Sequence, residues 1–315
     1  MFDPAPRSAA VPLVSCQTLG WYHSLFGGEA HAGEALAYIR RCGFDAIDYH
    51  FEGVYTANQI RNGVTSPVFD KPLDALLEYY APLKQAIDTQ GIVISQSHGI
   101  SPQYLTTNRE LSTYLRDVIR KSLEVCRFLG CPSMVLHPLR VLDLTENLRL
   151  FRELTPAALQ AGVTVCLENM FVGNEPFYDT PTACQIIDRL NDEAGAPVFG
   201  ACYDVGHANL SGRDHYRDIC TLGNRLVCLH IHDNDGIHDQ HLIPYTQKVP
   251  KETRPCTDWD GVWKGLAEIG YTGPINFEIH PALRIAPPEL TEDLLKLAAS
   301  IGRYIQTRIT RNETP

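Results

Sequence analysis

The segment VTVCLENMFVGNEPFYDTPTACQIIDRLNDEAGAPVFGACYDVGH, residues 163–207, contains one complete strand–helix–strand unit. Two short runs of β-branched or apolar residues, Val163–Glu168 and Val198–Asp204, enclose an amphipathic stretch of helical length, Thr180–Leu190. Strands joined by a crossover helix run parallel within one sheet. The segment therefore predicts a parallel sheet with helices packed outside it.

The same alternation continues on both sides of this segment and gives eight units. The expected strands are Val11–Cys16, Asp45–His50, Val93–His98, Ser133–His137, Val163–Glu168, Val198–Asp204, Leu226–His232 and Ile275–His280. The expected helices are Gly33–Arg41, Pro72–Thr89, Asn108–Leu129, Thr145–Ala161, Thr180–Leu190, Asp214–Leu222, Trp259–Ile269 and Pro288–Arg308. Eight such units in 315 residues predict a single (β/α)8 TIM barrel rather than an open doubly wound sheet. We expect one domain over residues 1–315, with residues 1–10 as an N-terminal tail.

The composition argues against several classes of protein. The chain has 37 Asp and Glu against 27 Lys and Arg, a formal charge of −10, and no basic stripe of the kind that binds nucleic acid. No stretch approaches the ~18 apolar residues of a membrane span, and the first ten residues lack the apolar run of a signal peptide. The ten cysteines include no C-x2-C pair, so we expect reduced thiols. These features predict a cytoplasmic protein with neither a nucleic-acid nor a membrane partner.

Ionisable residues lie at or near the carboxyl ends of six of the expected strands. They are His98, His137, Glu168, Asp204, His232 and Glu278. A buried parallel strand ordinarily ends in Val, Ile or Leu, so this set departs from the composition that the fold needs. The strand ends of a barrel share one mouth, where the three longest loops, 52–70, 169–179 and 233–258, would also gather. A divalent cation would hold such groups together and keep the carboxylates ionised.

Four of these residues form the expected metal site, and they are Glu168, Asp204, His232 and Glu278. Three carboxylates with one imidazole favour Mn²⁺, with Co²⁺, Mg²⁺ and Zn²⁺ as alternatives. His230 and His232 share one strand face, because side chains alternate with a period of two. His232 is nearer the mouth, so we expect it to be the ligand and His230 to lie one layer below. The same rule places Cys166 and Cys202 beneath Glu168 and Asp204, as packing residues.

Four short pieces carry a family resemblance: Leu167–Met170, Tyr203–His207, His230–Asp235 and Trp259–Glu278. In order and spacing they resemble the xylose-isomerase-like barrel superfamily, which groups sugar phosphate isomerases and epimerases, ketose 3-epimerases, inosose dehydratases and endonuclease IV. The resemblance implies a divalent metal on the four residues of the expected site. It also implies that Glu168 and Glu278 exchange a proton at the carbon next to a carbonyl, through a metal-stabilised ene-diolate, while His207 holds a substrate hydroxyl.

Further residues around the mouth are candidates for contacting a substrate or extra metals. We expect His98, His137, His241 and Trp21 to bind the substrate. Five residues resemble the extra zinc ligands of endonuclease IV, so the resemblance allows additional metal ions at the mouth. They are His98, His137, His207, Asp239 and His241. Trp21 and Phe171 lie in expected loops, where aromatic rings can wall a sugar.

The leading interpretation is a metal-dependent isomerase or epimerase of a keto-sugar, sugar derivative or cyclitol. The alternative is a lyase or dehydratase of the same fold, similar to inosose dehydratase or to a subunit that cleaves oxidised glycosides or C-glycosides. The acidic charge disfavours a repair nuclease like endonuclease IV, and the intact set of four ligands disfavours a non-catalytic sugar-binding protein. The stretch 233–240 lacks the Arg with which ketose epimerases usually grip their substrate, so the identity of the sugar stays open. We expect a small carbohydrate substrate and allow for a homo-oligomer or a small partner subunit.

Overall fold

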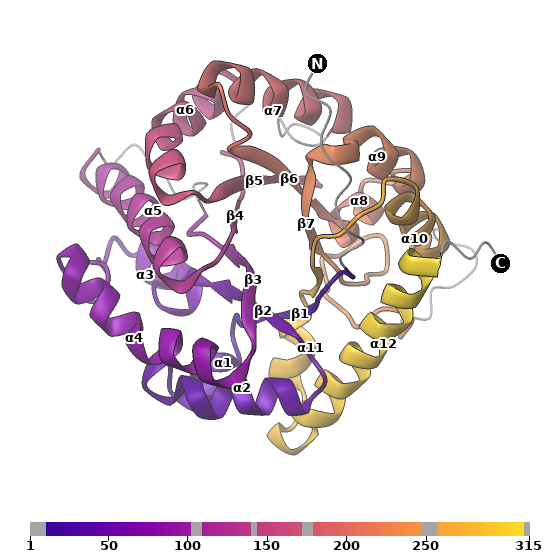
Figure 1. Cartoon of the computed structure of the whole chain (residues 1–315), viewed down its shortest axis with the longest axis horizontal. Coiled ribbons are helices and arrows are strands. Elements are labelled where there is room, and N and C mark those ends of the chain that lie inside the picture. Colours follow the sequence, from indigo (N-terminus) through magenta and orange to yellow (C-terminus); the bar gives the residue numbers. More distant parts are fainter. Residues whose placement is uncertain (1–10, 102–108, 140–143, 172–178, 247–256, 312–315) are drawn as a thin grey trace.

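The computed structural model describes residues 11–101, 109–139, 144–171, 179–246 and 257–311. Within them, eight parallel strands form one sheet in the order β7-β6-β5-β4-β3-β2-β1-β8, which curves into a barrel at the centre of the molecule (Figure 1). The strands are β1 Val14–Gln17, β2 Ala46–His50, β3 Val93–His98, β4 Ser133–Leu136, β5 Thr164–Glu168, β6 Phe199–Asp204, β7 Leu226–His230 and β8 Ile275–Phe277. The expected tail, residues 1–10, lies outside the described residues.

The barrel closes between β7 and β8. Strand β8 pairs with β1 along its whole length. On its other side it meets the chain beyond β7 through a bridge between Ile231 and Phe277. There the Ile231 amide donates to the Asn276 carbonyl oxygen (2.8 Å), and the Ile231 carbonyl accepts from the Glu278 amide (3.1 Å). The predicted (β/α)8 barrel is thereby confirmed.

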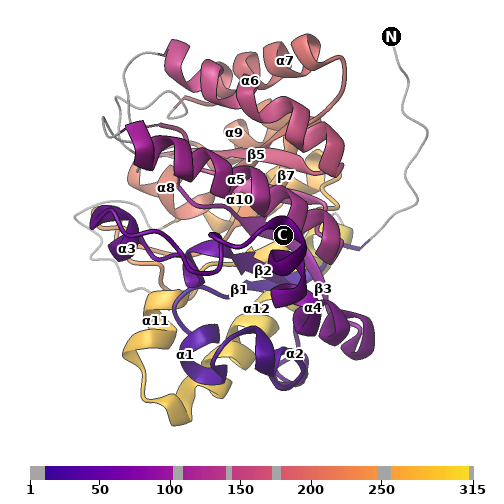
Figure 2. The same ribbon diagram turned by 90° about the vertical axis from the view of Figure 1, so that its left-hand side faces the viewer.

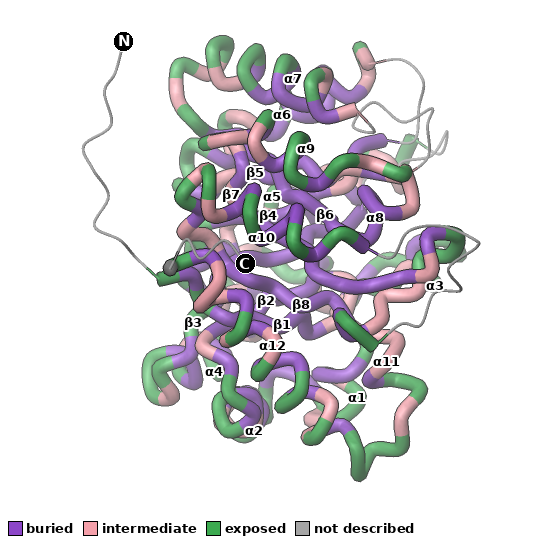
Figure 3. Tube along the Cα trace, turned by 90° about the vertical axis from the view of Figure 1, so that its right-hand side faces the viewer, coloured by how far each residue is buried: buried purple, intermediate pink, exposed green. Residues whose placement is uncertain are grey.

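Longer helices cover the outside of the barrel (Figure 1). They are α2 Ala32–Arg41, α4 Leu73–Gln90, α5 Arg109–Leu129, α6 Leu144–Ala161, α7 Thr180–Ala194, α9 His215–Leu222, α10 Trp259–Glu268 and α12 Thr291–Arg311. Each overlaps an expected helix, and Figure 3 shows their inner faces buried and their outer faces exposed. Across the described ranges, no helix combines the length and the apolar character that a membrane crossing needs.

Most of the short helices follow a strand, and one 3-10 turn precedes β7. The short helices are α1 Tyr22–Phe26, α3 Ala57–Arg61, α8 Val205–Leu210 and α11 His280–Ile285, and the 3-10 turns are η1 Glu29–His31, η2 Phe51–Gly53, η4 Gly223–Arg225 and η5 Pro288–Leu290. Figure 2 shows α3, α8 and α11 on the same side of the molecule. Because they follow β2, β6 and β8, that side is the C-terminal mouth of the barrel. Apolar periodicity does not predict these helices, since five or six residues are too few to display a helical period.

Element ends differ from the expected ones where tertiary contacts decide them. β7 ends at His230 and β8 at Phe277, two and three residues before the expected ends. Beyond β7 the backbone takes a different partner, because Asp233 pairs antiparallel with Leu242 in the following loop. Helix α7 continues to Ala194, where Gly195 at φ 66° supplies the left-handed cap.

The interior of the barrel has a polar half and an apolar half. The polar half consists of the fully buried side chains Gln17, Asp48, Gln96 and Asn276, from β1, β2, β3 and β8. The apolar half is a cluster formed by Val135, Cys166, Cys202 and Cys228, from β4 to β7. Burial raises the pKa of the Cys166 and Cys202 thiols well above its ordinary value. These two thiols therefore stay protonated and pack in the interior, as expected.

Candidate metal centre at the barrel mouth

Three carboxylates meet at the mouth of the barrel. Glu168 ends β5, Asp204 ends β6, and Glu278 follows directly after β8. Their exposed fractions are only 1%, 0% and 6%. One oxygen of each lies within 4.8 Å of the others and of a ring nitrogen of His230. The distances from His230 Nδ1 are 3.1 Å to Glu278 Oε2, 3.3 Å to Glu168 Oε1 and 3.7 Å to Asp204 Oδ2, so these four groups are close enough to share one cation.

His230, and not the expected His232, accompanies the three carboxylates. His232 lies further out, with Nε2 3.1 Å from Asp204 Oδ1 and 3.9 Å from Asp239 Oδ1. The physical reason is strand register: His230 is the residue of β7 that pairs with Asp204 of β6, and β7 ends there. The prediction that His230 lies one layer below the carboxylates is therefore wrong. His232 lies with Asp204 and His207 in a neighbouring group of potential ligands, and its role as a metal ligand stays a prediction.

Neighbouring histidines keep the buried carboxylates ionised. Burial acts to raise the pKa of Glu168 and Glu278, but the imidazoles around them outweigh it and hold both pKa values well below the ordinary 4.5. In the same way, nearby histidines lower the pKa of Asp204 to about 2 despite its burial. Burial lowers the pKa of His230, but the groups around it raise the value well above 6.5. In the metal-free centre the imidazoles are thus the cationic partners of the ionised carboxylates, a place that a divalent cation could take.

Polar atoms at the centre have unmet bonding capacity. Both ring nitrogens of His230 and Oε2 of Glu168 are buried, and they lack a hydrogen-bond partner within the part of the chain that the structure describes. An unpaired buried polar atom costs free energy. A divalent cation would pair the carboxylate oxygens and one imidazole nitrogen at once. The residues present therefore fit a bound divalent cation.

Two further histidines face the second oxygen of Glu168. Nε2 of His98 and Nε2 of His137 lie 3.4 Å and 3.1 Å from Glu168 Oε2, whereas Oε1 faces His230. His98 ends β3, and its ring stacks on His50, with 4.3 Å between centroids and 7° between planes. Glu168 thus lies between two groups of potential ligands, and His98 and His137 belong to the mouth as expected.

His207, Asp239 and His241 form a third group. Nε2 of His207 and Nε2 of His241 lie 3.5 Å and 3.3 Å from Asp239 Oδ2. Asp204 caps α8 by accepting a hydrogen bond from the His207 amide (2.6 Å), which fixes His207 one turn after that carboxylate. Burial lowers the pKa of both histidines, but nearby carboxylates raise the pKa of His207 to about 10 and that of His241 to about 9. The structure therefore brings these residues into one cluster with the main centre.

Trp21 is connected to the site through Gln17. Its indole is only 3% exposed, and Nε1 donates to the Gln17 carbonyl oxygen (2.7 Å). Gln17 Nε2 in turn donates to Glu278 Oε1 (2.7 Å). Trp21 therefore packs in the core, and its contact with a substrate stays a prediction. Phe171 lies against the His207 ring, with 4.9 Å between centroids.

Several residues of the site are not among the predicted site residues. His50 ends β2 opposite His98 of β3, so the strand-end rule that found His98 could have found it. Asp48 lies two residues earlier on the same face, inside the barrel. His280, the last residue of the expected eighth strand and the first of α11, joins His241 and Glu278 in a further group of potential ligands.

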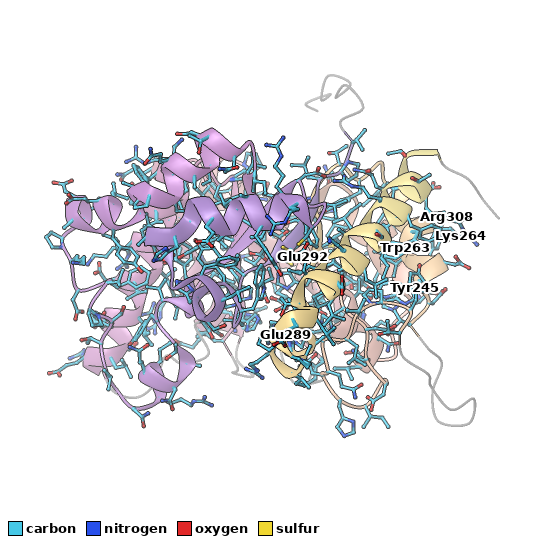
Figure 4. The ribbon with its side chains drawn as sticks, turned by 90° about the horizontal axis from the view of Figure 1, so that it is seen from below. Tyr245, Trp263, Lys264, Glu289, Glu292 and Arg308 are labelled. Carbon is cyan, nitrogen blue, oxygen red and sulfur yellow. The ribbon has the colours of Figure 1, made fainter. Side chains whose placement is uncertain are left out.

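The loop after β7 is anchored by buried hydrogen bonds. Asp233 accepts from Thr257 Oγ1 (2.7 Å) and from Trp259 Nε1 (3.3 Å). Trp263 Nε1 donates to the Tyr245 hydroxyl (2.8 Å), and Figure 4 shows both residues on the side of the molecule formed by α10 and α12. These contacts hold the two ends of the loop, and with them the segment that carries Asp239 and His241.

The sequence matches a known family and several curated relatives. The family model described as a xylose isomerase-like TIM barrel matches residues 36–301. An uncharacterized protein of Sinorhizobium fredii is 28% identical over 177 residues, which cover 51% of this chain and only about half, 51%, of that relative's length. A protein of Streptomyces coelicolor named as a putative hydroxypyruvate isomerase is 26% identical over 232 residues, 68% of this chain and 78% of its own.

Solved structures share the architecture over almost the whole chain. A D-allulose 3-epimerase from Methylomonas sp., solved in complex with D-allulose, superposes with a TM-score of 0.65 at 17% identity, covering 95% of this chain and 98% of that one. A D-tagatose 3-epimerase-like protein gives a TM-score of 0.66 at 18% identity, covering 95% and 99%. At such identities the likeness concerns the fold.

Proposed function

Because this chain belongs to the xylose isomerase-like TIM barrel family, and because its mouth gathers two glutamates around a potential cation site, we propose that it is a divalent-metal-dependent isomerase or epimerase. Its substrate in this proposal is a keto-sugar, a sugar derivative or a cyclitol. The D-allulose 3-epimerase and the putative hydroxypyruvate isomerase among the similar proteins support this class of reaction. The observation that carries the proposal is the convergence of Glu168 and Glu278 on His230 Nδ1, at 3.3 and 3.1 Å.

The proposed ligands of the cation are Glu168, Asp204, His230 and Glu278, with Mn²⁺ favoured over Co²⁺, Mg²⁺ and Zn²⁺. When bound, the cation supplies Lewis-acid polarisation of the substrate oxygens. Additional metals would use the outer groups, which comprise His98, His137, His207, Asp239 and His241.

The two glutamates are proposed to move the proton. Both are held in the ionised form by the neighbouring histidines, so either can remove a proton from the carbon next to a carbonyl. The glutamate that has taken this proton, or the other glutamate once it has taken up a proton from solvent, then gives a proton to that carbon or its neighbour. His207, a buried residue of α8, is proposed to hold a substrate hydroxyl.

Hydrogen exchange with solvent tests this function directly. The Mn²⁺-loaded protein is incubated in D2O with a panel of ketoses, keto-sugars and inososes, and deuterium is located by NMR. We expect deuterium at a single carbon adjacent to the carbonyl. Glu168→Gln and Glu278→Gln should each slow this exchange by about 100- to 10,000-fold, because each removes one proton-transfer group.

A matched control separates proton transfer from a general effect of lost charge. In the loop after β7, Oδ1 of Asp235 accepts hydrogen bonds from the backbone amides of Ile237 and His238. Asp235→Asn keeps this acceptor oxygen and removes the charge. This variant should exchange at the wild-type rate. Full exchange in both glutamate variants, or no exchange in a metal-loaded wild type across the whole panel, would refute the proposal, whereas a dehydrated or cleaved product would identify a lyase.

The proposal also covers the class of substrate, and the sequence adds predictions of the cellular location and the oligomeric state. We propose that the substrate is a small carbohydrate that binds at the barrel mouth. The names of the similar epimerases, which refer to sugars, support this class of substrate. A cytoplasmic location, and a homo-oligomer or a small partner subunit, remain predictions from the sequence.

A further inference from the structure

A carboxyl group lies inside the barrel, beneath the proposed metal centre. Asp48 of β2 is 0% exposed. Its Oδ2 accepts from Asn276 Nδ2 (2.8 Å) and from Gln96 Nε2 (3.1 Å), so two amide groups fix its orientation. Burying a carboxyl group is costly unless it serves a partner. The two amides donate to only one oxygen, and Oδ1 has no hydrogen-bond partner among the described residues.

The ring of His230 lies between Asp48 and the three carboxylates of the centre. Its Nδ1 faces Glu168, Asp204 and Glu278, whereas its Nε2 lies 3.6 Å from Asp48 Oδ2. This distance exceeds that of a hydrogen bond, and a small rotation of the ring or of the carboxyl group would close it. The His98 ring stacks on one face of His230, with 5.5 Å between centroids and 20° between planes, and so restricts how the ring can turn.

A neutral imidazole carries one N–H, and its other nitrogen is the one that can bind a metal. A carboxylate that accepts the N–H of a ligand histidine fixes which nitrogen is bare and how the ring is aimed. We propose that Asp48 is a positioning residue that accepts the Nε2–H of His230 and so presents a bare Nδ1 to the cation. The inference rests on the metal centre of the proposed function and extends it to the layer below.

An isosteric change tests the role of this charge. In Asp48→Asn the side-chain oxygen can take the place of Oδ2, so both amide donors keep an acceptor while the negative charge is lost. We expect the Kd for Mn²⁺, measured by titration calorimetry on the metal-free protein, to rise about 10- to 100-fold. The circular dichroism and the Tm of the metal-free protein should stay close to those of the wild type.

A second variant distinguishes charge from packing. Gln96 donates to Asp48 and to the Leu229 carbonyl oxygen, and Gln96→Met removes both bonds but leaves the Asp48 carboxyl group beside His230. This variant should lose thermal stability and keep a Kd for Mn²⁺ close to that of the wild type. Equal weakening of Mn²⁺ binding in both variants would show an effect of packing and overturn the proposal, as would a wild-type Kd in Asp48→Asn.

NMR of the wild type tests the tautomer without any change at Asp48. In Zn²⁺-loaded protein with ¹⁵N-labelled histidine, the His230 signals are identified by their loss in His230→Gln. We expect a low-field proton on Nε2, and a proton on Nδ1 instead would overturn the proposal even if Asp48→Asn does not fold. A wild type that binds Mn²⁺ but leaves every sugar unexchanged would refute the proposed activity alone. A wild type that binds no divalent cation would refute both.

Discussion

Two histidines that lie two residues apart at the mouth have different surroundings. His230 faces all three carboxylates of the centre, whereas His232 faces Asp204 and the outer Asp239. We therefore expect His230→Gln to weaken Mn²⁺ binding by more than about 100-fold, since losing a ligand costs more than losing a supporting contact. His232→Gln should weaken it by about 10-fold or less. Calorimetric titration of both variants checks this order, and a reversed order would restore His232 as the ligand.

Gly206 allows His232 to occupy its position. A Cβ atom at residue 206 would lie 1.9 Å from Cε1 of the His232 ring. Gly206→Ala must displace the ring or helix α8, and such overpacking costs about 1–3 kcal/mol of unfolding free energy. Gly33→Ala in α2 is the matched control, because nothing lies within 4 Å of the added Cβ. In urea unfolding the control should gain about 0.5–1 kcal/mol, and equal stability of the two variants would contradict the prediction.

Site residues could be predicted from the sequence where they lie at the carboxyl end of a strand, because these ends meet at one mouth of the barrel. Glu168 and Asp204 end their strands, and Glu278 lies one residue beyond β8, so their meeting follows from the parallel barrel. The choice between His230 and His232 could not be made, because it depends on where β7 ends, and the pairing of Ile231 with β8 decides that. Asp48 could not be assigned a role from the sequence, since its partners come from β3, β7 and β8.

At the scale of elements, helix α9 packs a neutral histidine against β6. His215 begins α9, and its Nδ1 lies 2.9 Å from the Tyr203 hydroxyl. Burial lowers the pKa of His215 from 6.5 to about 4. Between these two values the unfolded chain binds a proton that the folded chain does not, so stability from this residue is complete above pH 6.5 and is lost as the pH falls toward 4. The loss amounts to about 3 kcal/mol.

The variant His215→Asn isolates the contribution of His215 to the pH dependence of the unfolding free energy. The Asn side chain places an oxygen near the former Nδ1 and does not titrate, so its unfolding free energy should fall less steeply with acidification than that of the wild type. Urea unfolding at intervals between pH 7 and pH 4 measures both slopes. Other buried histidines, such as His50 and His280, contribute equally to the two proteins and cancel. Identical slopes would show that His215 does not stay neutral in the folded state.

The order of elements was predictable and several of their ends were not. Apolar runs and amphipathic periods locate all eight strands and the longer helices, because each buries one face in the barrel or against it. Among the short helices, α3 did carry a signal: Thr56 and Gln59 form a capping box at its start. The length of α7 depends on which of the following residues adopts a left-handed cap, and local pattern does not resolve this.

For the whole molecule, metal loading should appear as thermal stability. The metal-free centre crowds three ionised carboxylates in a buried space, and a cation that binds only the folded state shifts the unfolding equilibrium. At a free Mn²⁺ concentration of 100 times Kd the gain is about 2.7 kcal/mol, which raises Tm by several degrees. Calorimetric scans with Mn²⁺ and with EDTA measure the difference. The double variant Glu168→Gln/Glu278→Gln should show none, and an equal rise there would place the ion elsewhere.

The joint between β7 and β8 is held by the bridge at Ile231, and residues on either side of it, His230 and Glu278, belong to the proposed centre. A cation bound by both side chains would cross-link β7 and β8 where an isolated bridge joins them. Opening of the barrel between β7 and β8 would then require the cation to dissociate from one of these side chains. The exchange of the Ile231 and Glu278 amides with deuterated solvent should therefore slow when the protein is loaded with Mn²⁺. Amides between β4 and β5, far from the joint, should slow much less.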